Sequence, residues 1–117
     1  LNGGGADGNL FGGENTDTLF GGAGEDRYEG GDGADILVFA PTAGTVQDRI
    51  INFEDTGAIS DDIIDVTAYG FASVASITAS ASGDDAILDF GGGDTVRIVD
   101  YLLTNTLGDI GSDDFIL

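Results

Sequence analysis

Three aspartates, Asp17, Asp26 and Asp35, recur at a spacing of nine residues and are the groups in this sequence most able to do chemistry. Each is the sixth residue of a nine-residue unit, and the units cover residues 12–20, 21–29 and 30–38. If such units stack, the carboxylates come close together, which is unfavourable unless a cation lies between them. The chain contains no His and no Cys, so any ligands are oxygen atoms only. Oxygen-only ligands favour a hard cation of the Ca²⁺ kind.

The rest of each unit indicates how the aspartates are positioned. A Gly-Gly pair opens every unit, and a large apolar residue stands eighth. One apolar residue in nine cannot be buried by a unit alone, so neighbouring units must stack to form a shared core. The glycine-rich part suits a tight turn whose carbonyls point inward. The last three residues, as in 18–20 and 36–38, predict a short strand with its middle residue facing one side. Turn and strand then alternate, wound as a parallel β-roll.

The pattern over residues 12–38 resembles that of the RTX family of secreted calcium-binding proteins, whose nonapeptide is G-G-x-G-x-D-x-U-x, where U is a large apolar residue. The resemblance implies an all-β fold, a parallel β-roll or RTX nonapeptide solenoid. The alternative interpretation is a flexible acidic linker, which the composition alone would favour. The strict phase of the apolar residues argues against a linker, because a linker needs no period. These residues are Leu1, Leu10, Leu19, Tyr28 and Leu37.

The resemblance also implies where calcium ions bind. Family members hold each ion between turns two units apart, using the sixth-position Asp of both units and backbone carbonyls. On this sequence the first site comprises Gly13, Asn15 and Asp17 from one turn with Gly30, Asp32 and Asp35 from the other. The second comprises Gly22, Gly24 and Asp26 with Asp48, the aspartate of a D-x-I-x-x-F segment at 48–53.

A third site is less regular and involves the upstream unit at 3–11. There Asp7 arrives one residue early, and Gly8 occupies the ligand position. Either Asp7 slides into place or the site is weak. Its partners in the opposite turn would be Gly21, Ala23 and Asp26.

Beyond residue 38 the repeat ends. Strands are predicted near 48–53, 63–66, 86–90 and 95–99, the last two joined as a hairpin by residues 91–94, with one or two helical turns over 71–77. This part resembles the C-terminal segment of type I secretion substrates. It carries D-x-I-x-x-F at 48–53, D-x-I-D-V at 62–66, G-G-G-D-T at 91–95 and D-D-F-I-L at the end.

The tail is also expected to cap the roll, because the last coil of a repeat array exposes an apolar edge. The coil at 36–38 is apolar on both faces, so something should pack on its outer side; candidates are Phe39, Ile50, Phe53 and Ile64. We therefore expect one module over 1–117. It comprises calcium-binding repeats at 1–38 and a β-rich cap and secretion segment with a hairpin at 39–117.

Composition excludes several function classes. Twenty-two acidic residues against three basic ones give a net charge of −19, which argues against a nucleic-acid partner. Without His and Cys, Ser-His, Cys-His and zinc-dependent catalysis are excluded within these residues. We expect no enzymatic activity and no membrane insertion. With no Met, and a start at the eighth position of a repeat, we expect a piece of a longer protein with a covalently linked N-terminal domain.

The sequence therefore predicts a calcium-binding module of a larger secreted bacterial protein. It would fold on Ca²⁺ outside the cell, with the type I secretion machinery as a partner. The alternative is a carbohydrate-binding or adhesive auxiliary module, which an exposed aromatic pair or a basic groove would support. Tyr69 and Tyr101 could stack on a sugar, although burial is commoner for such residues. Arg97 is expected to pair with a neighbouring Asp across the strand face.

Overall fold

The computed structural model describes residues 1–41, 46–54, 61–103 and 105–117. These residues form an all-β fold with five short 3-10 turns and no α-helix within the described ranges. The strands are β1 (Asn9–Glu14), β2 (Thr18–Phe20), β3 (Arg27–Asp32), β4 (Ile36–Val38), β5 (Val46–Ile50), β6 (Ile63–Asp65), β7 (Thr78–Ser82), β8 (Asp85–Gly91), β9 (Asp94–Ile98) and β10 (Phe115–Ile116). The 3-10 turns are η1 (Thr67–Tyr69), η2 (Val74–Ser76), η3 (Tyr101–Leu103), η4 (Leu107–Asp109) and η5 (Ser112–Asp114).

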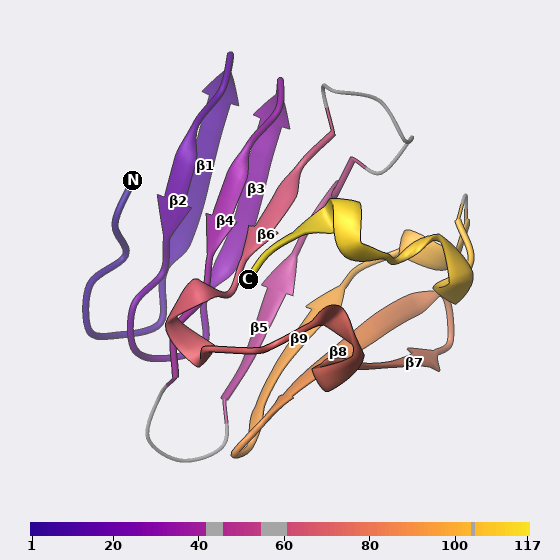
Figure 1. Ribbon diagram of the computed structural model, residues 1–117. Helices are drawn as coiled ribbons and strands as arrows, with labels where there is room; N and C mark the ends of the chain where they lie inside the picture. The colour runs from indigo at the N-terminus through magenta and orange to yellow at the C-terminus, as the bar shows by residue number, and fades with distance from the viewer. Residues whose placement is uncertain (42–45, 55–60, 104) are drawn as a thin grey trace.

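The strands form two sheets that lie as two layers (Figure 1). The larger sheet has the order β1-β3-β5-β9-β8-β7, and the smaller has the order β10-β6-β4-β2. In the repeats, consecutive strands alternate between the sheets, and each pairs in parallel with the strand two units later. Leu10 thus faces Tyr28, and Leu19 faces Leu37. Paired residues are two nine-residue units apart in the sequence, so residues at the same position of their units face each other in the sheets.

The tail continues both sheets instead of covering one end of the repeats. Strand β5 pairs in parallel with β3, β6 with β4, β9 with β5, and β10 with β6. Strand β8 is antiparallel to both of its neighbours, β7 and β9, so the larger sheet is mixed. Ile50 and Ile64, expected on the outer side of the last coil, instead extend the core rows at Tyr28 and Leu37. Phe39 is also buried, and Phe53 packs against the core from its edge.

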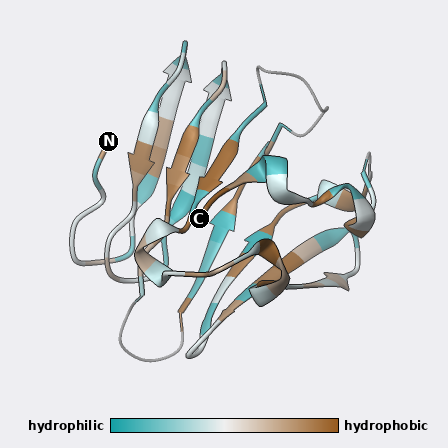
Figure 2. Ribbon diagram, viewed as in Figure 1, coloured by the Kyte–Doolittle hydropathy of each residue, from teal (hydrophilic) through white to brown (hydrophobic). Residues whose placement is uncertain are grey.

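The core lies between the sheets and is one continuous cluster. The eighth residue of each unit from Leu10 to Leu37 is almost fully buried, whereas Leu1 is 61% exposed. Burying such a side chain contributes about 1.5–3 kcal/mol. The hydrophobic bands on β2, β4 and β6 run side by side in Figure 2, which makes this row visible. In the tail the core is supplied mainly by β8 and β9, through Leu88, Val96 and Ile98.

The predicted hairpin is confirmed, since β8 and β9 pair across the glycine-rich turn. The helical turns expected over 71–77 are represented by the single 3-10 turn η2. The strand predicted near 48–53 is β5, which begins at Val46, directly after residues 42–45 that lie outside the described ranges. Within the described ranges, no helix has the length and apolar character needed to cross a bilayer.

Candidate metal centre

The repeat turns share one backbone conformation, which places the sixth-position aspartates at equivalent points. The second residue of a unit has positive φ, 112° at Gly13 and 99° at Gly31. The fourth position is also left-handed, with φ of 122° at Gly33 and 73° at Asn15. Asn tolerates this region better than most residues, because its short polar side chain can bond locally. The unit that lacks the fourth-position glycine therefore makes the same turn as the others.

Turns two units apart stack in direct contact. A Cβ added to Gly33 would lie 2.6 Å from the carbonyl oxygen of Asn15, and one on Gly31 would collide with the carbonyl oxygen of Gly13. A Cβ on Gly12 would lie 2.5 Å from the carbonyl oxygen of Gly30 and 2.8 Å from Oδ2 of Asp17. An oxygen from each of two stacked turns therefore converges beside Gly12.

The aspartates themselves form two columns of hydrogen bonds. In the first column, which is Asp17, Asp35 and Asp62, the backbone N–H of Asp17 donates to Oδ1 of Asp35 at 2.8 Å. The N–H of Asp35 donates to Oδ1 of Asp62 at 3.1 Å. In the second column, which is Gly8, Asp26 and Asp48, the N–H of Gly8 donates to Oδ1 of Asp26 at 2.8 Å. The N–H of Asp26 donates to Oδ1 of Asp48 at 2.8 Å. Each column brings carboxylates of successive coils together.

The other carboxylate oxygen of the repeat aspartates is unsatisfied. Oδ2 of Asp17, Asp26 and Asp35 is buried and accepts no hydrogen bond from the part of the chain that the structure describes. A buried polar atom without a partner costs about 1–3 kcal/mol, and more when it carries charge. These three oxygens occupy the same position of three consecutive units, so the feature belongs to the repeat and not to one irregular turn.

Burial also disfavours the ionised form of these groups. It raises the pKa of Asp26 and Asp35, against the lowering effect of the backbone N–H groups that donate to them. Burial raises the pKa of Asp48 and that of Asp62 to about 6, again against backbone hydrogen bonds, with neighbouring carboxylates adding to the shift. A bound cation would favour the ionised forms and so offset this cost.

The donor set fits a calcium ion. Nitrogen and sulfur ligands are absent from the sequence, since it has no His and no Cys. Among the described residues, no three or more Asp or Glu side chains gather closely enough to hold a metal by themselves. An ion here would need backbone carbonyls besides the carboxylates. Ca²⁺ accepts six to eight oxygens in flexible geometry, including backbone carbonyls, whereas Mg²⁺ demands a near-ideal octahedron.

The predicted ligands of the first site are placed as follows. The turn that contains Gly13 and Asn15 stacks on the turn of the unit that begins at Gly30. The N–H of Asp17 donates to Asp35, and the carbonyl of Gly30 faces Gly12. Asp32 pairs with Glu14 through its strand and has an exposed side chain. Asp32 could therefore contribute to an interior site through its backbone only.

The predicted ligands of the other two sites share the turn at 21–26. Asp26 and Asp48 lie together, but residues 42–45, which precede Asp48, lie outside the described ranges. Gly22 and Gly24 stack on the upstream turn, where a Cβ would collide with Gly4 and approach Asp7. The N–H of Ala23 donates to the Gly4 carbonyl at 3.0 Å, and the carbonyl of Gly21 faces Gly3.

Asp7 does not slide into the ligand position. Its Oδ1 accepts the N–H of Glu25 at 2.9 Å, while Gly8 keeps the sixth position and donates to Asp26. The second column therefore begins with a residue that has no carboxylate. That the site of the first unit is weak stays a prediction.

Asp62 belongs to the first column but was not among the predicted ligands. It lies 27 residues after Asp35, which is three units and not two, with the segment 55–60 between. A signal was present in the sequence, because Asp62-Ile63-Ile64 repeats the order of Asp35-Ile36-Leu37. The pairing of Ile36 with Ile63 shows that the two segments are equivalent in the sheet.

Comparison with known proteins gives little further information. No protein-family model matches the chain. No curated protein sequence matches it either. Among solved structures it is similar to the solution structure of the AlgE6R3 subunit from the Azotobacter vinelandii mannuronan C5-epimerase. The sequences are 23% identical, the match covers 96% of this chain and 78% of the other, and the TM-score is 0.42. The functional proposals rest on this chain's own residues.

Proposed function

We propose that this chain is a calcium-binding module of a larger secreted bacterial protein, an RTX β-roll closed by a β-rich tail. The observation that carries the proposal is the set of three buried carboxylate oxygens, on Asp17, Asp26 and Asp35, that accept no hydrogen bond from the described residues. Their repetition at one position, together with stacked turns rich in carbonyls, is what an oxygen-ligated divalent cation requires. The unequal first unit, with Gly8 in the sixth position, makes its site the weakest.

Calcium binding would then be part of folding. Without the ion, the stacked aspartates repel one another, and the glycine-rich turns lose much conformational entropy on ordering. A site that forms only in the folded chain converts binding free energy into folding free energy. Affinities of extracellular calcium modules lie at roughly 10⁻⁴ to 10⁻³ M. In that range the repeats would stay unfolded in a cell interior poor in free Ca²⁺ and fold outside.

The test is a calcium titration followed by circular dichroism and calorimetry. Chain in excess chelator should lack part of the β signal and regain it with Ca²⁺ but not with equal Mg²⁺. Asp17→Ala and Asp35→Ala should each remove the same ion, and the double variant should be little worse than either single one. Asp113→Ala, at an exposed position of the tail, is the matched control. Identical spectra in chelator and in calcium would end the proposal.

We further propose that the tail addresses the protein to a type I exporter. The support is the ending Asp113-Asp114-Phe115-Ile116-Leu117 after a repeat block, with Ile116 and Leu117 partly exposed. Residues 39–117, fused to a passenger in a cell with such an exporter, should leave the cell. Retention of the passenger while a known substrate is exported would reduce the tail to a structural part of the fold.

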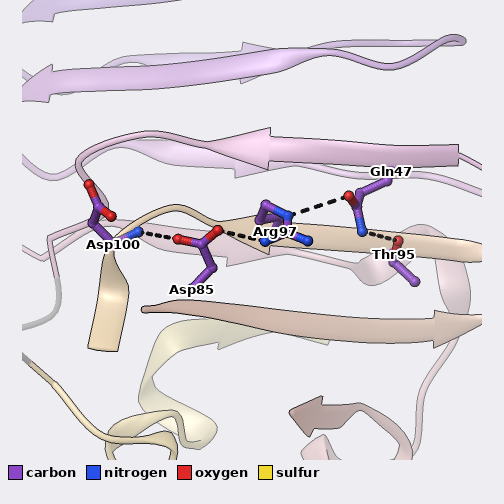
Figure 3. A network of polar contacts seen from close by, with 5 residues as sticks. All are labelled: Gln47, Asp85, Thr95, Arg97 and Asp100. Atoms are coloured by element: carbon purple, nitrogen blue, oxygen red, sulfur yellow. Dashed lines mark hydrogen bonds and ion pairs between the residues drawn. The ribbon is translucent and has the colours of Figure 1, made fainter. Parts of the chain in front are cut away.

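A second candidate function, the binding of an acidic carbohydrate, is favoured by the placement of the three basic residues. Arg27, Arg49 and Arg97 lie in register on adjacent strands β3, β5 and β9, next to buried core positions. Arg27 pairs with Glu29 at 3.2 Å. Arg97 pairs with Asp85 at 2.6 Å, as expected from the sequence, and lies between Asp85 and Gln47 in Figure 3.

Only Arg49, the exposed middle member of the row, has no ion pair among the described residues. The aromatic pair considered for sugar stacking is not available, because Tyr101 is buried and the Tyr69 hydroxyl bonds Asp94. Polygalacturonate serves as the probe in a binding titration. Arg49→Gln should weaken binding at least about tenfold if the row is a site. No binding by the calcium-loaded chain would leave the arginines as ion-pair partners only.

A further inference from the structure

The carboxylate of Asp62 is satisfied by backbone donors on both oxygens. Oδ1 accepts the N–H of Asp35 at 3.1 Å, and Oδ2 accepts the N–H of Glu54 at 3.0 Å. The residue is 1% exposed, so water does not share in this arrangement. Two N–H bonds to one carboxylate are charge-assisted and stronger than neutral ones.

Asp35 precedes Asp62 in the same column and is equally buried, but its carboxylate has different hydrogen bonds. Its Oδ1 accepts the N–H of Asp17, and its Oδ2 accepts nothing from the described residues. The flanking strands β4 and β6 are in register, so the two aspartates hold equivalent places in successive coils. What distinguishes them is the N–H of Glu54, which lies where the repeat turns provide no donor.

The local chain explains why Asp62 receives this extra donor. The N–H of Asp62 also donates to the carbonyl of Glu54 at 3.0 Å. Glu54 and Asp62 are thus joined by two hydrogen bonds, one from the backbone N–H of Asp62 and one to its side chain. The carboxylate and the backbone of Asp62 therefore both bind Glu54.

We propose that Asp62 ends the first column: its backbone donors take the place of an ion, so Asp62 is a closing residue and not a calcium ligand. This inference rests on the proposed calcium function. A cation at Oδ2 of Asp62 would have to displace the Glu54 N–H and so break one of the two hydrogen bonds between Glu54 and Asp62. The same reasoning leaves Asp35 as the last residue of the column whose free oxygen faces an ion.

The second column provides the matched control. Asp48 holds the corresponding terminal place and accepts the N–H of Asp26. Within the described residues, only this one donor to the Asp48 carboxylate is seen, whereas Asp62 has two. On the described residues the Asp48 carboxylate has one donor fewer than that of Asp62, so we expect Asp48 to act as a ligand.

The experiment counts calcium ions per chain by native mass spectrometry and calorimetry. We compare the wild-type chain with Asp62→Asn, Asp35→Asn and Asp48→Asn. Asp62→Asn should keep the wild-type number of ions, with dissociation constants changed by less than about threefold, and lower the melting temperature by roughly 5–15 °C. Asp35→Asn and Asp48→Asn should each bind one ion fewer. An ion lost in Asp62→Asn as in Asp35→Asn would overturn the inference.

A measurement on the wild-type chain decides the matter if Asp62→Asn does not fold. Exchange of Ca²⁺ for the larger Sr²⁺ should move the side-chain carboxyl ¹³C resonance of Asp35 and leave that of Asp62 in place. Equal movement of both resonances would make Asp62 a ligand and overturn the inference. Failure of the wild-type chain to bind any calcium is a different outcome, because it would refute the proposed function itself.

Discussion

The repeats and the tail build the same two sheets but satisfy their polar groups in different ways. In the repeats, the sixth-position carboxylates each have one buried oxygen that no residue in the described part of the chain hydrogen-bonds. In the tail, Asp62 is bonded on both oxygens, and Asp85 pairs with Arg97 and accepts the N–H of Asp100. Asp62 and Asp85 of the tail are therefore satisfied by donors of the chain itself, whereas the repeat aspartates leave a role for an external cation.

The repeats and the tail also differ in how many apolar side chains they bury. Each repeat unit places one side chain fully in the core, such as Leu19 or Leu37. The hairpin β8–β9 alone buries Ala86, Leu88, Phe90, Val96 and Ile98. Since the hydrophobic effect scales with the apolar area removed from water, the hairpin has much more driving force per residue. Under the proposed function, one continuous sheet would therefore contain a part that is stable by itself and a part that depends on a bound ion.

Chelation of calcium should give the largest effect, because it tests directly whether the repeats depend on the ion and the tail does not. With excess chelator, backbone amides around Leu10, Leu19 and Leu37 should exchange at least about 100-fold faster, because the repeats lose their order. Amides around Leu88 and Val96 should keep most of their protection. Hydrogen exchange read by mass spectrometry measures both halves in one sample. Equal loss of protection in the two halves would mean that they fold as one unit.

Truncation of a core side chain should have the next largest effect. It compares the packing of the tail with that of the repeats, with and without calcium. Leu88→Ala should lower the free energy of unfolding by about 2–5 kcal/mol with or without calcium, because its packing in the hairpin is independent of the ion. Leu19→Ala, at an equally buried repeat position, should show such a loss only when calcium is bound. Urea unfolding in calcium and in chelator provides the four values. A loss for Leu19→Ala in chelator would show that the repeats are ordered without the ion.

A pair of glycine substitutions tests the stacking of the repeat turns. Gly33→Ala would force a Cβ to 2.6 Å from the Asn15 carbonyl at a φ of 122°, so we expect a cost above about 3 kcal/mol. Gly70→Ala, in the tail, has a φ of 69° but nothing within 4 Å of the added Cβ. Its cost should be about 1–2 kcal/mol. Thermal unfolding in saturating calcium compares the two, and equal costs would argue against close stacking.

Acidification should partly replace calcium. Folding raises the pKa of Asp48 and Asp62 from 3.8 to about 6, and burial also raises that of Asp26 and Asp35. The folded chain therefore takes up protons between about pH 4 and 6, so the calcium-free fold gains stability as the pH falls through 6 and loses it as the pH rises. Circular dichroism in chelator should show β structure increasing from pH 7 to 5. A decrease would mean that other groups dominate the titration.

The sequence predicted the repeat well because its period is a physical one. A spacing of nine residues fixes which side chains share a face, so the burial of Leu19 and Leu37 and the closeness of Asp17 and Asp35 follow from phase alone. The hairpin was predictable because its glycines lie between two alternating apolar runs. The remaining features depend on segments that break the phase. The pairing of Tyr28 with Ile50 spans 22 residues, which is not a multiple of nine. That of Asp35 with Asp62 spans 27, three units instead of two, so the two-unit spacing of the repeats indicates neither.

The smallest expected effect is that of Asp7→Ala, which tests the sequence register of the first repeat unit. Its carboxylate is exposed and accepts one N–H, from Glu25, so Asp7→Ala should cost no more than about 1 kcal/mol and leave the calcium count unchanged. Asp26→Ala removes a buried carboxylate from the second column and should lower the count by one. The two residues face the same turn, so a calorimetric titration of both variants holds the surroundings constant. If Asp7→Ala also loses an ion, then Asp7 enters the ligand position when calcium binds, and the first unit is a full repeat despite its shifted aspartate. If it does not, the first turn is held without an ion of its own, by contacts such as the hydrogen bond from the N–H of Gly8 to Asp26.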